Sequence, residues 1–447
     1  MLIDPVPRLS SSDRTLHPSD TASLPLQDVR SNAYLREAAG MSVTPRLNAA
    51  VTGREVSLFR PDLITQHEHL RSAISGARVL IVGGAGSIGT ATTRMLLGYE
   101  PGHLDVVDQN ENSLAELVRD LRSDGLAPPG RALVTLPLDV GSATMTRFIR
   151  ERPPYDMVLN FAALKHVRSE KDAYSLLQML DTNLVRAAAL INALRDRSPI
   201  TAYFAVSTDK AASPVSLMGA SKRLMEHLVF AAGQPPQELA RVTSARFANV
   251  AFSDGSLLDS VLRRVARGQL VACPEGVRRY FISADEAAAI CLLAAVVLPG
   301  QRLLVPRLQP TTDLRELAEV VKSVIRARGF EPREYRTEVE ARANLHRDVS
   351  EGAYPLLLTP ADTDGEKPFE EFVGPGEALV DAGLGAALAI HYRPGPAGAL
   401  EEVMSRLRYA VSDPAASITK ATLVAWLAEA VPELSHAATG RSLDDRV

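Results

Sequence analysis

The 447-residue sequence is poor in cysteine, lacks a long apolar run and has no excess of basic residues. Two cysteines, Cys273 and Cys291, cannot build a disulfide framework, and no Cys/His spacing resembles a metal site. We therefore expect a cytoplasmic protein without a bound metal. A formal net charge of -4 gives no reason to expect nucleic acid as a partner. Without a bilayer-length apolar run or a signal-peptide pattern, membrane insertion is not expected.

The length exceeds one average domain, and hydrophobic content of 46% with 23% charged residues is typical of globular proteins. The first part of the chain is rich in Ser, Pro, Arg and Thr with weak periodicity, which is typical of an arm that wraps a partner. We predict four regions: an extended or partner-wrapping arm at 1–54, a nucleotide-binding domain with a catalytic loop at 55–245, a smaller ligand-binding region at 246–394, and a helical extension at 395–447. The arm and the amphipathic terminal helices suggest a homo-oligomer.

Short apolar runs alternate with helical patterns through the second region. The predicted strands are Arg78–Val82, Leu104–Val107, Leu133–Leu136, Met157–Asn160 and Ala202–Val206. Alternation of this kind predicts an α/β fold, a doubly wound parallel sheet of the Rossmann type. Its ligands should lie beyond the carboxyl ends of the strands.

A glycine-rich turn follows the first strand and begins a helical pattern at Thr90 to Leu97. A strand, turn and helix in this order place backbone N–H groups and a positive helix end where a pyrophosphate can bind. The residues predicted to bind a cofactor here are Gly83, Gly86, Ser87, Ile88 and Gly89.

Asp108 ends the second strand, where a carboxylate can accept hydrogen bonds from the adenosine ribose. No arginine follows it directly, which favours NAD over NADP. The alternative is that Asp108 caps the next helix. Asp139 and Val140, after the third strand, are predicted to contact adenine, although Asp139 could also be a turn residue.

Asp209 and Lys210 follow the strand Ala202–Val206, and together they can supply a general acid and a general base. The alternative is a surface ion pair. Met218 and Lys222 lie one helical turn apart, a spacing that resembles the tyrosine and lysine of a short-chain dehydrogenase site, with methionine in place of the tyrosine. Viewed alone, they are an ordinary core residue and a surface lysine.

Several ordered blocks give the chain a resemblance to the NAD-dependent nucleotide-sugar 4,6-dehydratases, polysaccharide-biosynthesis enzymes of the extended short-chain dehydrogenase superfamily. The blocks are the glycine loop, Asn160–Val167, Ser207–Lys210, Met218–Arg223, Arg246–Val250, Arg279–Phe281 and Gly365–Glu371. The resemblance is dense over Val79 to Val305 and weaker beyond.

The resemblance implies a reaction cycle on a nucleotide sugar, most plausibly UDP-N-acetylglucosamine. NAD takes hydride from C4, Lys210 removes the C5 proton, Asp209 protonates the departing C6 hydroxyl, and hydride returns to C6. The product is a 4-keto-6-deoxy sugar. With Met218 unable to take the C4 hydroxyl proton, the candidate acceptors are Thr208, Lys210 or a water held by Lys222.

The same resemblance implies further binding residues. Those implied on the cofactor side are Ala162, Ala163, Lys165 and Lys222, and those implied on the substrate side are Lys165, His166, Asn249, Arg263 and Arg279. Arg264 and Arg267 are further candidates on the same helical pattern as Arg263, of which some must face solvent. His166 could equally be a packed structural histidine.

Two departures from the family pattern affect the expected substrate. Ala248 replaces a glycine, and Ala251 to Asp254 replaces the usual Leu-Gly-Ser-Arg. Two other functions stay open: a nucleotide-sugar epimerase, and a catalytically silent NAD-binding scaffold. The Asp209 and Lys210 pair favours elimination, since epimerisation at C4 needs no acid at C6.

Overall fold

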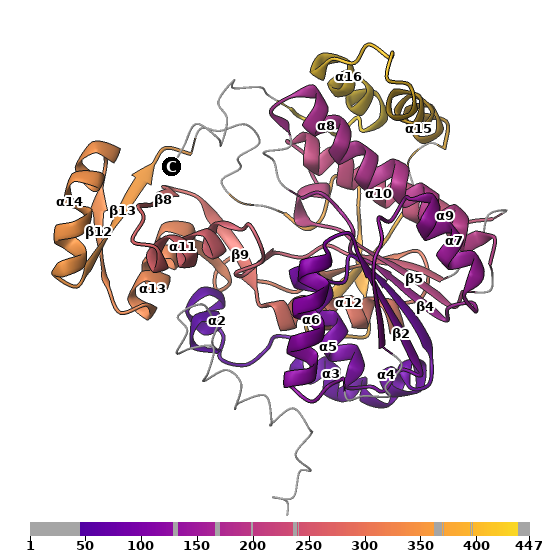
Figure 1. The fold of residues 1–447 in the computed structure, drawn as a ribbon, viewed down its shortest axis with the longest axis horizontal. Coiled ribbons are helices and arrows are strands. Elements are labelled where there is room, and N and C mark those ends of the chain that lie inside the picture. The colour runs from indigo at the N-terminus through magenta and orange to yellow at the C-terminus, as the bar shows by residue number, and fades with distance from the viewer. Residues whose placement is uncertain are drawn as a thin grey trace, which may run out of the picture. The chain divides into compact units, whose positions relative to one another are not determined.

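The computed structural model describes residues 45–127, 133–165, 170–197, 200–235, 239, 241–361, 369, 371–393, 395 and 397–436 (Figure 1). The chain is divided into two units after Ser42, and every described residue belongs to the second, a compact unit over Val43–Val447. The predicted N-terminal arm lies outside the described residues up to residue 44. Most of the predicted motif Gly365–Glu371 also lies outside them.

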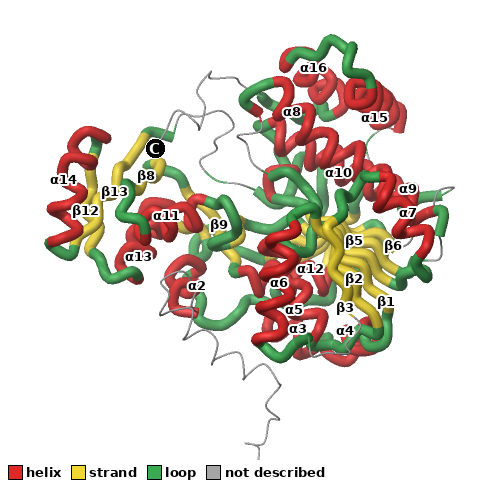
Figure 2. Tube along the Cα trace, in the orientation of Figure 1, coloured by secondary structure: helices red, strands yellow, loops and turns green. Residues whose placement is uncertain are grey.

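A large, mostly parallel sheet forms the centre of the second unit (Figure 2). Its strands are β1 (Arg78–Val82), β2 (His103–Asp108), β3 (Leu133–Pro137), β4 (Met157–Asn160), β5 (Ala202–Val206), β6 (Arg241–Ala245), β10 (Arg302–Pro306), β14 (Leu379–Asp381) and β15 (Ala387–His391). They lie in the order β14-β15-β10-β6-β5-β4-β1-β2-β3, with β15 antiparallel to β10 and to β14. The order 3-2-1-4-5-6 confirms the predicted doubly wound fold, and the order reverses between β1 and β4.

Helices cover both faces of this sheet (Figure 1). One face carries α3 (Arg60–Thr65), α4 (His67–Ile74), α5 (Ser87–Leu97), α6 (Glu111–Ser123) and α12 (Ala284–Val296). The other carries α7 (Ala143–Glu151), α8 (Ala173–Leu180), the π-helix η3 (Asp181–Arg186), α9 (Ala187–Arg195), α10 (Leu217–Ala232), α15 (Ala397–Ser412) and α16 (Lys420–Ala430). Strand β1 shows the division, because Leu80 and Val82 join one core and Val79 and Ile81 the other.

A smaller part of the unit contains two three-stranded sheets. One sheet has the order β11-β9-β7, with β7 (Asn249–Val250), β9 (Arg278–Ile282) and β11 (Leu314–Glu316). The other has the order β12-β13-β8, with β8 (Val271–Pro274), β12 (Glu331–Tyr335) and β13 (Ala353–Thr359). Four helices belong to this part: α2 (Pro45–Thr52), α11 (Leu257–Ala266), α13 (Leu317–Ala327) and α14 (Glu338–Ser350). Residues 246–394 thus contribute to the large sheet as well as to the two small ones.

Helix α12 is apolar on all sides. Every residue from Glu286 to Val296 is buried, because the helix packs between α5 and the strands β5 and β6. No helix in the described part of the chain is long and apolar enough to cross a bilayer.

Candidate active site

The turn after β1 brings two backbone segments into close contact. Gly83 has a φ of +74°, and a Cβ on it would lie 2.6 Å from the backbone nitrogen of Ala162, beyond β4. A Cβ on Gly89 would collide with the carbonyl oxygen of Gly83, so α5 can start this close to the turn only with glycine there. The turn therefore lies at the point where the strand order reverses.

The start of α5 has the features of an anion site. Its N-cap is Gly86, which offers no side chain to the first N–H groups of the helix. Positive potential at a helix start favours an anion. The Ser87 hydroxyl accepts a hydrogen bond of 2.9 Å from the backbone N–H of Asp254. The segment that departs from the family pattern thus lies against the glycine turn.

Asp108 is hydrogen-bonded to the glycine turn and does not cap the next helix. Its Oδ2 accepts from the Ala85 N–H at 3.0 Å, and its Oδ1 from the Asn110 N–H at 2.9 Å. The cap of α6 is Asn110, whose side chain accepts from the N–H of Ser113. Since a carboxylate has about four acceptor positions, two remain for a ligand's hydroxyls.

Asp139 is paired with an arginine that the sequence did not single out. Its Oδ2 forms an ion pair with Arg186, and its Oδ1 accepts from the Gly141 N–H at 3.1 Å. Arg186 ends the π-helix and also contacts Asp181 at 2.7 Å. Val140 is buried in the core beside them. Any contact of Asp139 with adenine has to share the carboxylate with Arg186.

The loop after β4 is fixed by buried amides. Asn160 accepts from the Ala162 N–H at 3.0 Å. Asn183 accepts from the Leu164 N–H at 2.8 Å and donates to the Leu164 carbonyl and to the Ser221 hydroxyl, both at 3.0 Å. Asn183 lies in a helical pattern next to apolar residues, where its amide has to be buried. That position is the one feature of the sequence that could have indicated its role in holding this loop.

The predicted catalytic pair lies directly beyond β5. Thr208 donates to Asp209 Oδ1 at 2.8 Å, and the Lys210 ammonium lies 3.1 Å from the same oxygen. The side chain of Asp209 is only 2% exposed, and its Oδ2 is buried with no hydrogen-bond partner in the described part of the chain. A buried acceptor without a partner is uncommon and marks a place for a ligand or a proton.

Lys222 is a buried cation with weak contacts. Its ammonium lies 3.4 Å from the Val206 carbonyl and 3.8 Å from the Met225 sulfur. Burial lowers its pKa to about 8, against the charge of Glu226 and together with that of Lys165. Met218, one turn earlier on the helix, is buried as well. Because Lys222 is itself buried, the alternative interpretation of an ordinary surface lysine is wrong.

The backbone of Met218 is hydrogen-bonded to an acidic side chain that the sequence did not single out. Its backbone N–H donates to Glu170 Oε1 at 2.9 Å, at the start of α10. Burial raises the pKa of Glu170, while hydrogen bonds from Met218 and Leu217 oppose the rise. A carboxylate at a helix start is stabilising, but no local pattern connects residue 170 to this helix.

The loop after β4 also contains three residues that the sequence predicted to bind the cofactor. Ala162 and Ala163 are half-buried next to the glycine turn, and Lys165 is exposed. Desolvation by the protein around its ammonium lowers the Lys165 pKa, against the charges of Asp254 and Asp259. His166 lies outside the described residues. In the described ranges, no group of three or more His, Cys, Asp or Glu side chains is placed to hold a metal ion.

Two of the predicted substrate residues lie on neighbouring strands. Asn249 starts β7 and donates to the Tyr280 carbonyl at 3.3 Å, and Arg279 lies on β9 next to it. Arg263 instead pairs with Asp259 on its own helix at 3.0 Å, with its side chain 52% exposed. The contacts therefore group Asn249 with Arg279, and Arg263 with the surface of α11.

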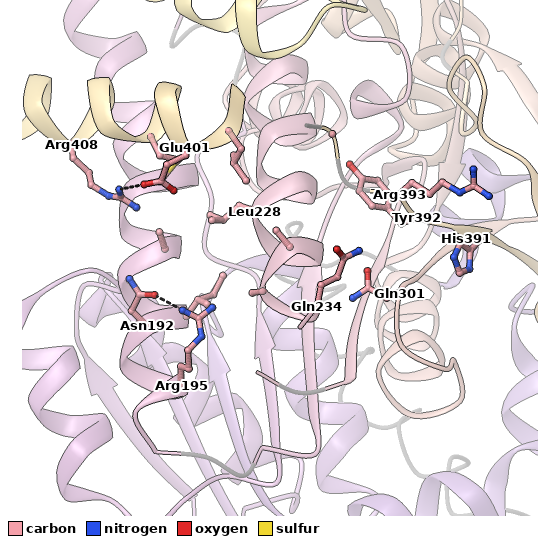
Figure 3. Close-up of a pocket in the computed structure, with 17 residues that line it drawn as sticks. Asn192, Arg195, Leu228, Gln234, Gln301, His391, Tyr392, Arg393, Glu401 and Arg408 are labelled. Atoms are coloured by element: carbon pink, nitrogen blue, oxygen red, sulfur yellow. Dashed lines mark hydrogen bonds and ion pairs between the residues drawn. The ribbon is translucent and has the colours of Figure 1, made fainter. Parts of the chain in front are cut away.

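A cavity of about 590 Å³ lies away from the predicted site residues (Figure 3). It is bordered by α9, the last turns of α10, the end of β15, and α15, and its residues include Arg195, Gln234, Gln301 and Tyr392. None of the predicted site residues lines it. Helix α10 thus reaches from Met218 and Lys222 at one end to this cavity at the other.

Comparison with known sequences gives a match to the profile of a family described as polysaccharide biosynthesis protein, over residues 79–372. An uncharacterized membrane protein of Methanocaldococcus jannaschii is 29% identical over 264 residues, which cover 58% of this chain and 75% of that protein. A UDP-N-acetylglucosamine 4,6-dehydratase (inverting) of Campylobacter jejuni is 26% identical over 251 residues, covering 55% of this chain and 71% of the enzyme.

Solved structures share the fold. Pen from Bacillus thuringiensis aligns with a TM-score of 0.59 at 20% identity, over 72% of this chain and 89% of Pen. DesIV, a dTDP-glucose 4,6-dehydratase from Streptomyces venezuelae with NAD and TYD bound, aligns with a TM-score of 0.50 at 17% identity, over 75% and 97% of the two chains. At these identities the likeness is one of fold.

Proposed function

Because the chain belongs to the polysaccharide biosynthesis protein family and has the fold of the extended short-chain dehydrogenases, we propose that it dehydrates a nucleotide sugar with NAD as cofactor. The proposed substrate is UDP-N-acetylglucosamine, on which the relative from Campylobacter jejuni acts by name. The proposed product is the 4-keto-6-deoxy sugar. The observation that carries this proposal is the buried, unpartnered Asp209 Oδ2 beside the Lys210 ammonium.

The residues present fit a bound NAD. The glycine turn and the uncapped start of α5 supply backbone N–H groups for a pyrophosphate. Asp108 keeps acceptor positions for the hydroxyls of the adenosine ribose. Lys222 could bind the nicotinamide ribose, since it would give up only weak contacts within the protein. When bound, NAD supplies the acceptor and later the donor of a hydride.

Asp209 and Lys210 divide the elimination between them. In its neutral form, Lys210 removes the proton from C5, which the neighbouring C4 ketone makes acidic. Protonated Asp209 gives its proton to the C6 oxygen, and water leaves with a double bond formed between C5 and C6. When a hydride has been added at C6, C5 takes up a proton from Lys210 or the solvent, and this is the position at which solvent deuterium enters. Asp209 has an oxygen that no described group occupies, whereas its other oxygen holds Thr208 and Lys210 in place.

The C4 hydroxyl needs a different proton acceptor from the usual tyrosine. Thr208 already donates its own proton to Asp209 and accepts from the Lys210 N–H at 3.4 Å. Lys222, with a pKa of about 8, releases its proton at a lower pH than an exposed lysine does, and it is buried one turn from Met218. We assign the acceptor to Lys222 or to a water that it holds.

One incubation tests the proposal. The purified protein is given UDP-N-acetylglucosamine in deuterated water, and the sugar is followed by mass and NMR. Loss of water with solvent deuterium at C5 is the expected result. An isomer of unchanged mass would identify an epimerase instead, and no turnover across a panel of nucleotide sugars would refute both enzyme functions.

Lys210→Ala tests the assignment of the base. The variant should lose deuterium incorporation at C5 and still copurify with NAD, because Lys210 holds no part of the cofactor in this proposal. Lys322→Ala is the matched control, since Lys322 pairs with Glu319 and Glu334 away from the site. Exchange at C5 that survives Lys210→Ala would show that another group is the base.

A further inference from the structure

Arg246, the residue after β6, is completely buried and has each of its N–H donors paired. Its Nε and Nη2 donate to the two oxygens of Glu226 at 2.7 and 2.6 Å. Its Nη1 and Nη2 donate to the two oxygens of Glu377 at 2.6 and 2.9 Å, and Nη1 also donates to the Phe372 carbonyl at 3.0 Å. A guanidinium has five N–H donors, so Arg246 has none left for a substrate phosphate.

A second arginine completes the charge balance. Arg223 donates to Glu377 at 2.6 Å and to Glu226 at 3.3 Å. We call Arg223, Glu226, Arg246 and Glu377 the arginine–glutamate cluster. Burial alone would raise the pKa of Glu377, but its hydrogen bonds and the positive charges lower it to about 2. The cluster thus stays ionised, and loss of one member leaves a buried charge unpaired.

The cluster contacts the catalytic loop directly. Ser207 donates its hydroxyl proton to Glu226 Oε1 at 2.6 Å, and its backbone N–H donates to the Ala245 carbonyl at 2.9 Å. Ser207 immediately precedes Thr208, Asp209 and Lys210. Glu226 lies on α10 one turn after Lys222, so one carboxylate connects the loop with the helix of the buried lysine.

The cluster also connects these elements with the loop Phe372–Glu377. The Gly374 N–H donates to Glu377 Oε2 at 2.7 Å, which closes the loop on itself. The Phe372 ring lies 5.4 Å from the ring of Tyr280, the neighbour of Arg279 on β9. This loop therefore contacts both the strand of a predicted substrate residue and the support of the catalytic loop.

We propose that Glu377 is a positioning residue for the Ser207–Lys210 loop, acting through Arg246 and Glu226 on a site that it does not touch. The effect on catalysis rests on the proposed function. The effect on the loop itself does not, because it follows from the hydrogen bonds alone. Glu377→Gln removes the charge at nearly constant size and turns an N–H group towards the arginines.

Two measurements test this proposal on the full-length protein. The first is hydrogen exchange of the backbone amides from 206 to 211, which should become faster in Glu377→Gln as the loop loses its support. The second is steady-state kinetics, in which kcat should fall by about 10-fold to 100-fold, since small misplacements of reacting groups have effects of this size. KM and bound NAD should change by less than about 3-fold.

Glu433→Gln is the matched control. Glu433 pairs with Arg223 at 3.0 Å from the outer side, with its side chain 26% exposed, and the cluster keeps both of its carboxylates without it. Its exchange and kcat should match the unaltered protein. Glu377→Asp keeps the charge and should recover part of the kcat that Glu377→Gln loses.

Each outcome has a definite meaning. Unchanged exchange at 206–211 overturns the proposal, whatever the protein catalyses. Faster exchange with unchanged kcat also overturns it, as does a fall in the free energy of unfolding without a change in kcat well below the melting temperature. Absence of dehydration in the unaltered protein refutes the proposed function, while the exchange measurement still decides whether Glu377 supports the loop.

Discussion

Lys222→Met should stabilise the protein while removing its activity. The ammonium of Lys222 is buried without a carboxylate partner within salt-bridge distance in the described part of the chain. Burial lowers its pKa from 10.5 to about 8. The gap between these values corresponds to about 3 kcal/mol, since each tenfold change in an equilibrium constant is about 1.4 kcal/mol. Methionine has a similar length and no charge to desolvate.

The sign of the effect with pH follows from proton binding. Below about pH 8 the folded and unfolded chains both hold the proton, and the folded state carries the full cost of the buried charge. Between about pH 8 and pH 10.5 the folded chain has released the proton and the unfolded chain keeps it. The contribution of Lys222 to stability therefore rises with pH across this window. The advantage of the methionine variant should be about 3 kcal/mol near pH 7 and less than about 1 kcal/mol at about pH 10.

The assay is urea unfolding of NAD-free protein at these two pH values. Lys420→Met, at the half-exposed start of α16, is the control and should leave the free energy of unfolding within about 0.5 kcal/mol at both. The reasoning is refuted if Lys222→Met is no more stable than the unaltered protein near neutrality. It is equally refuted if the difference between them does not shrink as the pH rises.

Three further substitutions have defined outcomes. Asp209→Asn should abolish loss of water while C4 oxidation still produces NADH absorbance, whereas Asp196→Asn, in an exposed pair with Arg150, should be as active as the unaltered protein; dehydration by Asp209→Asn would exclude it as the acid. Asp108→Asn should weaken NAD binding at least about 10-fold in a fluorescence titration, because a hydrogen bond to a charged group contributes about 1.5 to 3 kcal/mol; unchanged affinity would place the ribose elsewhere. Asn183→Ala should lower the free energy of unfolding, measured in urea, by about 1 to 3 kcal/mol, because the backbone N–H and carbonyl of Leu164 lose their hydrogen-bond partner. Asn192→Ala, on the exposed side of α9, should leave the free energy of unfolding unchanged.

Five of the parallel strands, β1 to β5, could be predicted almost to the residue. Arg78–Val82, Met157–Asn160 and Ala202–Val206 have the bounds predicted from the sequence. Strands buried on both faces are continuous apolar runs, and polar or glycine residues end them sharply. The positions of the Ser207–Lys210 loop and of the glycine turn could be predicted for the same reason, since each is a short segment placed by the strand before it.

Other elements left no local signal. Helix α14 buries only Ala341 and Asp348, so its sequence has no apolar period to recognise. The sequence from Asp313 to Arg328 has a helical pattern, yet its start is strand β11, because Leu314 pairs with Tyr280 on β9. That pairing joins distant segments and overrides the local helical preference.

The site's long-range partners were missed for a similar reason. The ion pair between Asp139 and Arg186 joins residues that are far apart in sequence, and neither neighbourhood points to the other. The pairing of Arg246 with Glu377 is more distant still. In the sequence Arg246 belongs to the same block of family resemblance as Asn249, and nothing there indicates that its donors are fully used inside the protein.

The arginine–glutamate cluster also has a consequence for biosynthesis. Chains emerge from the ribosome from the N-terminus, and early segments can fold while later ones are still being made. When β6 and α10 have emerged, the buried side chain of Arg246 has only one of its two carboxylates, because Glu377 follows 131 residues later. The nascent sheet must keep a guanidinium partly unpaired or open to water during that interval. The part of this protein that forms the large sheet can therefore complete its own interior only after the C-terminal part has been synthesised.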